Sequence, residues 1–378
     1  MSAATVRRIN VSEYVAQRLL GLTARPVIPS PDEVHGAPVV GTHDGTFHCD
    51  EALACGLLRH TTQFAGCAVT RTRQPDVLAK CVAIVDVGGV FNVDTLRFDH
   101  HQPEFHGTMN TGLKQYATRL SSAGLVYETY GREILKKYLE TCVEQGAVRS
   151  ADLPGGITED IITLLFDQLY TFFIEHIDGI DNGVDEFGAG DGVQLVRRYG
   201  VSSTLSARIG RLYPRWNEVQ TRADEDNMFI KAVQLATTEF FEALDHVVCS
   251  WWPARAIVRT AIANATTIYP SGQIARLSQS GVPWRDHLVS VEEECNAAGR
   301  TLYLLFQDTK GNWSIYAAPK SAGSFHSRKA LPWKGLRDEA LSQASGIADC
   351  IFVHVSGFVG GNKTYDGALA MATKALTM

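Results

Sequence analysis

The stretch Thr42-His43-Asp44-Gly45-Thr46-Phe47-His48-Cys49-Asp50-Glu51 follows a short apolar run, Pro38 to Val40, and is the most informative part of the chain. A second group, Asp99-His100-His101, follows the apolar run Leu96 to Phe98. Both groups are therefore expected where buried strands end. Imidazole and carboxylate groups clustered at strand ends suit Mn, Fe, Zn or Mg and can share a bridging water. The pattern predicts a metal site built for hydrolytic chemistry.

Two further segments fit the same site. The run Cys81 to Asp86 is apolar and β-branched and ends in a carboxylate, as in a buried parallel strand, and Ile177 to Gly183 places Asp178 and Asp181 before a Gly-marked turn. Taken singly, each segment has a simpler interpretation, because an Asp after a strand often caps a helix or forms a turn. Four such clusters on successive segments favour a metal site.

Strand and helix patterns alternate through the first half of the chain. We expect strands at residues 39–40, 69–72 and 81–87 and helices at 50–60, 121–140 and 159–177. This alternation predicts an α/β fold with a mainly parallel sheet flanked by helices and with ligands at the carboxyl ends of its strands. A long helical stretch, Asp224 to about Asn264, is interrupted at Trp251-Trp252-Pro253. A β-hairpin at 301–317 and a strand at 350–355 follow.

Composition narrows the function classes. The chain of 378 residues is 45% hydrophobic and 20% charged, which is typical of a soluble protein of two domains, and no apolar stretch reaches the roughly 20 residues that span a bilayer. Its net charge of -6 argues against a broad basic surface for duplex nucleic acid. The eight cysteines form no C-x-x-C pair and are typical of reduced thiols in an intracellular protein.

The N-terminal segment has two interpretations. Four arginines (Arg7, Arg8, Arg18 and Arg25) stand against one acid, Glu13, as in a weak mitochondrial transit segment. The alternative is a short amphipathic helix docked on the body, or a disordered tail before Pro29-Ser30-Pro31. Mitochondrion, nucleus and cytoplasm all stay open as locations.

The ordered motifs identify a family resemblance. They are His43-x-Gly45-x-Phe47-His48-x-Asp50-Glu51, Asp86, Asp99-His100-His101-Gln102, Asp178-x-x-Asp181-Asn182-Gly183 and Gly357-Phe358-Val359-Gly360-Gly361-Asn362-Lys363. From about Ala37 to the C-terminus the chain closely resembles the melanocyte proliferating gene 1 family, a branch of the DHH phosphoesterase superfamily. The resemblance implies a DHH-type catalytic domain carrying two divalent metals, usually Mn, and a smaller C-terminal α/β substrate-binding domain across a cleft. It also implies 3′ to 5′ exonuclease activity on RNA.

The expected boundaries follow from the patterns and the resemblance together. We expect an N-terminal extension at 1–36, the metal-binding domain at 37–223, a connecting helical region at 224–268 and the substrate-binding domain at 269–378. No membrane partner is expected. The oligomeric state is open, with a homodimer among the alternatives.

The resemblance also assigns roles within the metal site. The expected metal ligands are His43, His48, Asp50, Asp86, His100, Asp178 and Asp181, with Asp86 bridging two ions. His101 is expected to face the substrate as an acid or phosphate ligand, and Asp99 to orient an imidazole, as carboxylates do for ligating histidines. Asp178 and Asp181 are alternatives for one position. The imidazole of His48 stands where the superfamily usually has aspartate, which favours Mn, Fe or Zn over Mg.

The C-terminal segment is expected to select the substrate. A strand through His354 is predicted to enter a Gly-rich loop whose backbone approaches phosphate, followed by a helix from about Tyr365. The expected substrate contacts are His326, Arg328, His354, Gly360, Gly361, Asn362 and Lys363. A plain turn at Gly360-Gly361 and a solvated loop near His326 are the alternatives.

Three functions from different classes follow. The favoured one is a Mn-dependent 3′ to 5′ exoribonuclease acting on RNA or short oligonucleotides by two-metal activation of water. The second is a small-nucleotide phosphatase or pyrophosphatase, which would use the same ligands. The third is a non-catalytic, metal-stabilised RNA-binding protein, against which the complete ligand set argues.

Overall fold

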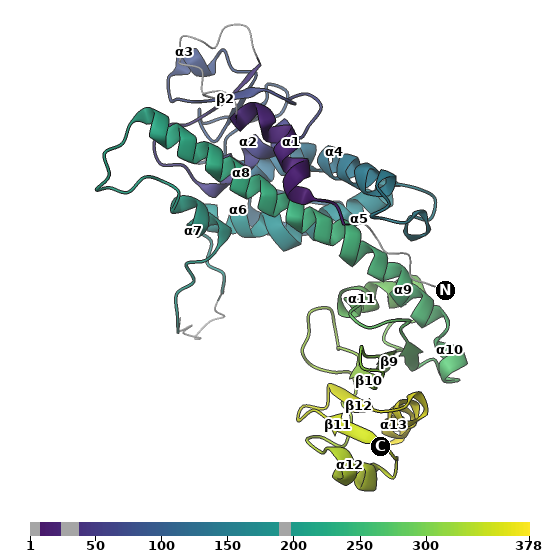
Figure 1. Ribbon diagram of the computed structural model, residues 1–378. Coiled ribbons are helices and arrows are strands. Elements are labelled where there is room, and N and C mark those ends of the chain that lie inside the picture. Colours follow the sequence, from purple (N-terminus) through teal and green to yellow (C-terminus); the bar gives the residue numbers. More distant parts are fainter. Residues whose placement is uncertain (1–7, 24–37, 189–197) are drawn as a thin grey trace. The chain divides into compact units, whose positions relative to one another are not determined.

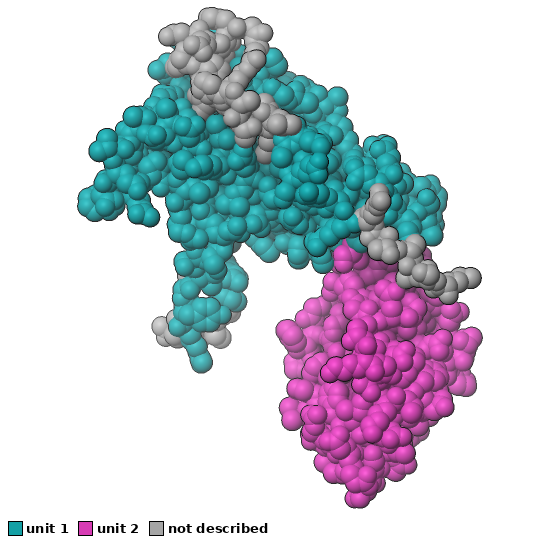
Figure 2. Space-filling view, in the orientation of Figure 1, with its two compact units in different colours: residues 1–249 teal, residues 250–378 magenta. Residues whose placement is uncertain are grey.

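The chain forms two compact units, Met1–Cys249 and Ser250–Met378 (Figure 2). The computed structural model describes residues 8–23, 38–188 and 198–378. Arg7, Arg25 and Pro29 to Pro31, which entered the two interpretations of the N-terminus, lie outside the described residues. Within the described part, no helix is long and apolar enough to cross a bilayer.

The first unit is built on a five-stranded sheet in the order β2-β1-β3-β5-β4. Strands β1 (Val39–Thr42), β2 (Ala68–Arg71), β3 (Ala83–Val85) and β5 (Arg97–Phe98) pair in parallel, and β4 (Phe91–Asn92) is antiparallel at one edge. The apolar runs of β1 and β3 are wholly buried, as expected for central strands covered on both faces. The predicted α/β fold with a parallel sheet is confirmed.

Helix α2 (Cys49–Arg59) lies at the centre of this unit, and every one of its residues is buried. It packs against α4 (Ser122–Glu144) and α8 (Arg222–His246). A Cβ atom on Gly56 would lie 1.9 Å from Thr237 Oγ1, so α2 and α8 approach as closely as they do only because residue 56 is glycine. This packing fixes the N-terminus of α2 beside the sheet.

The remaining helices of the first unit surround this core. The N-terminal helix α1 (Val11–Thr23) lies against α8 (Figure 1), with Val11 and Val15 buried. A helix docked on the body, one of the alternatives for the N-terminal segment, is therefore present. The other elements are α3 (Pro75–Leu78), the β6–β7 hairpin (Thr108–Asn110 and Gln115–Arg119), η2 (Ser150–Asp152), α5 (Glu159–Leu169), the π-helical turn η3 (Tyr170–Ile174), α6 (Glu175–Asp181) and α7 (Leu205–Gly210).

The predicted long helical stretch is present as three consecutive elements. Helix α8 ends at His246, a π-helical turn η4 (Val247–Trp251) follows, and α9 (Trp252–Ala263) begins immediately after it. Pro253, which has no backbone N–H to donate, lies in the first turn of α9, where the π-helical turn gives way to an α-helix. The division between the two units falls inside η4.

The second unit has a five-stranded sheet in the order β11-β12-β10-β9-β8. Only β8 (Ile274–Arg276) and β9 (Tyr303–Gln307) are parallel, and β10 (Trp313–Ala317), β12 (Val359–Asn362) and β11 (Cys350–Val353) continue the sheet antiparallel. The other elements are α10 (Ala265–Ile268), α11 (Trp284–Glu294), α12 (Asp338–Ser345) and α13 (Tyr365–Thr377).

The side chains of successive β9 residues pack into two separate hydrophobic cores of this unit. Tyr303 and Leu305 pack with Met371 of α13, whereas Leu304 packs with Val258 of α9 and Leu288 of α11. Successive side chains of a strand point to opposite faces, so the sheet is covered by helices on both sides.

Candidate metal centre

The residues that follow three parallel strands lie together at the carboxyl end of the first sheet. His43 follows β1, Asp86 follows β3, and Asp99-His100-His101 follows β5. Because parallel strands end at the same edge, residues far apart in the sequence meet there. The structure brings together most of the predicted ligands at this edge.

Asp86 lies at the middle of the cluster. Its Oδ2 is 3.3 Å from His43 Nε2, and its Oδ1 is 3.4 Å from His100 Nε2 and 3.5 Å from His101 Nδ1. Ser122 Oγ donates a hydrogen bond to Oδ1 at 3.0 Å. The two carboxylate oxygens therefore serve two different groups of side chains, which is the arrangement that a bridging carboxylate requires.

The first group lies at the N-terminus of α2. It comprises His43, His48, Glu51 and Asp86, whose ligand atoms all lie within 4.8 Å of one another. His43 Nδ1 donates to Asp44 O, so Nε2 faces inward, 3.1 Å from Glu51 Oε1. Glu51 also accepts from the His48 backbone N–H at 2.7 Å. Glu51 stood in the quoted motif but was not among the predicted ligands.

The second group lies on the other side of Asp86. His100 Nε2 is 3.2 Å from Asp181 Oδ2, and Asp50, His100 and Asp181 could hold an ion together, as could Asp86, His100 and His101. The other ring nitrogen of His100 lies 3.3 Å from Asn182 Oδ1. This contact leaves Nε2 directed at the carboxylates, as in ligating histidines whose second nitrogen is held by a neighbour.

The two candidate aspartates of α6 have different environments. Asp178 is fully buried and accepts hydrogen bonds from Ser121 N, Ser121 Oγ and Tyr170 OH, so both of its oxygens are occupied. Burial raises its pKa to about 7 despite these donors. Asp181 instead faces His100. The geometry favours Asp181 as the ligand and gives Asp178 a structural role.

Asp99 lies behind the cluster and positions His101. Its Oδ1 accepts from the backbone N–H of His101 and from His101 Nδ1 at 2.8 Å, while its Oδ2 accepts from Gly89 N. His101 is 62% exposed in its side chain, in contrast to the buried His43 and His100. Its Nε2 is therefore the imidazole atom available to an incoming molecule.

The buried carboxylates of the cluster need positive charge close to them. Burial lowers the pKa of His43, but Asp86 and Glu51 outweigh it and raise that pKa to about 10. Burial also lowers the pKa of His100, but Asp181 and Asp86 outweigh this effect and raise that pKa to about 9. The pKa of Asp86 is lowered because its contacts with His100 and His43 outweigh the effect of burial. Without metal, protons on the two histidines supply the positive charge.

Several ligand atoms have no hydrogen-bond partner. Both oxygens of the fully buried Asp50 and Oε2 of Glu51 lack one among the described residues, and burial raises the pKa of Asp50 above its usual range. An unpaired buried carboxylate is costly unless it binds a cation or a proton. The imidazole and carboxylate donors fit divalent ions of the Mn, Fe or Zn type. The residues present therefore fit a metal centre.

The structure of the second unit has a strand where a Gly-rich loop was predicted. Gly360 and Gly361 lie inside the buried strand β12, paired with β10 and β11, and not in a loop. A Cβ atom on Gly360 would come within 2.9 Å of Leu331 Cδ1 and 3.1 Å of Phe352 O. These glycines allow close packing within the sheet, and their backbone lies in a ladder between two strands. The predicted loop was wrong, and the substrate contact at these residues stays a prediction.

The other predicted substrate residues are dispersed in this unit. Asn362 is buried and joins Ala348 O to Thr364 N, and Arg328 is bound to the buried Glu292 at 2.8 Å. Both side chains thus have structural partners. The exposed ones are His326, His354 and Lys363, of which Lys363 lies 3.7 Å from Asp349.

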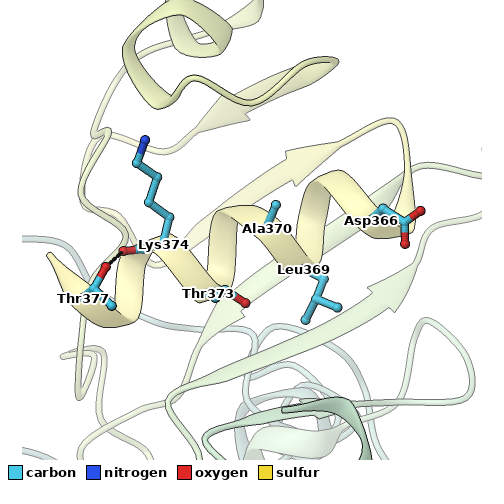
Figure 3. A pocket seen from close by; sticks show the side chains of 6 residues that line it. All are labelled: Asp366, Leu369, Ala370, Thr373, Lys374 and Thr377. Atoms are coloured by element: carbon cyan, nitrogen blue, oxygen red, sulfur yellow. Dashed lines mark hydrogen bonds between the residues drawn. The ribbon is translucent and has the colours of Figure 1, made fainter. Parts of the chain in front are cut away.

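Two surface hollows are lined by residues other than the ligands of the metal centre. One, of about 450 Å³, follows a single face of α13, from Asp366 to Thr377 (Figure 3). Another, of about 610 Å³, is lined by residues between Arg211 and Met228. None of the lining residues belongs to the metal centre, so neither hollow carries a functional argument.

Comparison with known proteins gives the family. A family model described as an uncharacterised protein family (UPF0160), MYG1 exonuclease, matches residues 39–376. The MYG1 exonuclease of Bos taurus is 42% identical over 364 residues, covering 94% of this chain and 90% of the bovine protein. The Homo sapiens MYG1 exonuclease is 40% identical over 96% of this chain and 92% of its own length. A MYG1 protein of Saccharomyces cerevisiae is 34% identical over 89% and 94%. No solved structure matches. The chain belongs to the MYG1 exonuclease family.

Proposed function

We propose that the chain is a divalent-metal-dependent phosphodiester hydrolase that removes nucleotides from the 3′ end of RNA or short oligonucleotides with two metal ions. The observation that carries the proposal is Asp86, whose two oxygens face two separate groups of histidine and carboxylate ligands. The names of the bovine and human relatives support exonuclease action. The 3′ to 5′ polarity and the preference for RNA rest on the family resemblance.

The ligands divide between two ion positions. His43, His48 and Glu51 would hold one ion, and Asp50, His100 and Asp181 the other, with Asp86 between them. When bound, such ions polarise phosphoryl oxygens and lower the pKa of a water between them. The helix dipole at the N-terminus of α2 adds positive potential beside the first position.

His101 is the residue placed to act on the substrate. Asp99 accepts the Nδ1 proton, which fixes the ring so that Nε2 faces outward. From there the protonated ring can donate to a phosphate oxygen or to the departing 3′ oxygen. This role requires no covalent nucleophile.

The decisive experiment incubates the purified full chain and Mn²⁺ with 5′-labelled RNA, single-stranded DNA, duplex RNA and small nucleotides. We expect a descending ladder from single-stranded RNA, with only a moderate loss of binding as salt rises. A single internal product would contradict exonuclease action. Release of phosphate from small nucleotides alone would favour the phosphatase alternative.

A matched pair of variants tests the bridging carboxylate. Asp86→Asn should abolish hydrolysis and lower the metal content, because the amide cannot bridge two cations. Asp94→Asn removes an exposed carboxylate from the nearby turn and should change neither. Full activity with full metal content in Asp86→Asn would refute the two-metal assignment.

A further inference from the structure

A second cluster of metal-binding side chains lies in the first unit, apart from the ligands described above. It consists of Cys142 on α4, Asp245 at the end of α8 and Cys249 in the π-helical turn η4. The ligand atoms lie within 4.8 Å of one another, and the two sulfur atoms are 3.6 Å apart. Cys142 and Cys249, the most widely separated pair, are 107 positions apart in the sequence, so the fold brings the three residues together.

We propose that Cys142, Asp245 and Cys249 form a second metal site, which binds a thiophilic divalent cation of the zinc class. Two thiolates on one tetrahedral zinc, at about 2.3 Å each, lie about 3.8 Å apart. The observed separation is close to this value. A disulfide would require about 2.0 Å.

The electrostatics of the cluster call for a cation. Asp245 is buried and accepts a hydrogen bond from Tyr138, but no lysine, arginine or histidine among the described residues forms an ion pair with it. A buried carboxylate beside two thiols is unfavourable without a counter-charge. A divalent ion would supply that charge and deprotonate both thiols.

The surroundings hold the ligands in place and leave one side open. Tyr138 OH donates to Asp245 Oδ1 at 3.0 Å, which orients the carboxylate as outer partners of metal ligands do. Cys142 is fully buried, whereas Cys249 is only half-buried. Water can therefore complete the coordination on the side of Cys249. π-Helical turns such as η4 occur frequently at functional sites.

Thiolate ligands make this site separable from the hydrolytic centre. The hydrolytic centre consists of histidines and carboxylates, so Cd²⁺ or Co²⁺ bound there gives no sulfur-to-metal charge-transfer absorption. Reduced full-length protein is titrated with Cd²⁺ alone and then with Co²⁺, and Zn²⁺ is added as competitor. We expect one equivalent of thiolate-bound metal, displaced by Zn²⁺.

Two variants complete the test. Cys249→Ser should lose the charge-transfer band and one equivalent of zinc, whereas Cys295→Ser, which alters another partly buried cysteine outside the cluster, should keep both. Tyr138→Phe should weaken Cd²⁺ binding by about tenfold. No band in the reduced wild-type protein, or a band that survives in Cys249→Ser, would overturn the site. So would a Cys142–Cys249 disulfide found by mass spectrometry in protein that binds no thiolate metal. Because the readout is spectroscopic, its failure leaves the hydrolytic proposal untouched.

Discussion

Asp178 and Asp181 lie three residues apart on α6 but have different roles. Asp178 is a structural carboxylate, and Asp181 is a candidate metal ligand. Asp178→Ala would leave Ser121 N, Ser121 Oγ and Tyr170 OH without their acceptor, so we expect a loss of about 1–3 kcal/mol in unfolding free energy with metal content retained. Asp181→Ala should do the reverse, because it faces His100 and is partly exposed. Denaturant unfolding and metal analysis of both variants check this. Equal metal loss in the two would contradict the assignment.

His60 gives the first unit a defined acid sensitivity. It is buried, its Nδ1 donates to Gly56 O, and burial lowers its pKa from 6.5 to about 4. As the pH falls below 6.5 the unfolded chain binds a proton there before the folded chain does. Stability is therefore lost between pH 6.5 and 4, by up to about 3 kcal/mol.

The variant His60→Asn isolates this effect. The amide nitrogen of Asn can replace Nδ1 as the donor to Gly56 O, and it does not titrate. In metal-free protein, the difference in unfolding free energy between wild type and His60→Asn should shift by that amount between pH 6.5 and 4. A difference that is constant with pH would show that His60 titrates normally. The exposed His326→Asn serves as the control.

At the scale of elements, the turn between β1 and α2 depends on a buried arginine. Arg71 at the end of β2 donates to Gly45 O, lies 3.3 Å from Asp226, and stacks between the rings of Phe47 and Phe229. Arg71 is only 1% exposed and lies beneath the turn that carries His43 and His48. Its role is to position the turn.

Arg71→Met should therefore affect both stability and metal binding. Removing one partner of a mostly buried ion pair costs about 3 kcal/mol, and loosening the turn should weaken Mn²⁺ binding by about tenfold. Arg73→Met is the matched control, because Arg73 is 64% exposed and its ion pair is with the exposed Asp44. Isothermal titration with Mn²⁺ and urea unfolding measure both effects. An unchanged affinity in Arg71→Met would remove Arg71 from the positioning of the site.

The elements also show what the sequence could predict. Apolar runs followed by polar residues located β1, β3 and the ligands at their ends, because burial and strand direction are both written in the local pattern. The choice between Asp178 and Asp181 was not predictable, since it depends on donors from Ser121 and Tyr170. Glu51 was missed because a helix N-terminus explains it without a metal. A loop was predicted at Gly360-Gly361 where the structure has a strand, because glycine suits both a phosphate-binding loop and close packing within a sheet.

At the scale of the whole molecule, each unit has its own sheet and core, and all the ligands of the candidate metal centre belong to the first unit. A cation at 1,000 times its Kd stabilises the folded state by about 4 kcal/mol. Chelation with EDTA should therefore lower the Tm of one calorimetric transition by roughly 10 °C and leave a second transition unchanged. Equal shifts of both transitions would show that the units unfold together.

The backbone of Asp86 has a consequence for inherited variation. Its φ of 58° lies in the left-handed region, where asparagine and aspartate are tolerated and β-branched residues are strongly disfavoured. Asp86→Asn should therefore give cells a normal amount of inactive protein, which can still occupy substrate. Asp86→Val should instead reduce the amount of protein itself. Two alleles at one codon would differ in dominance, and immunoblotting beside an activity assay would distinguish them.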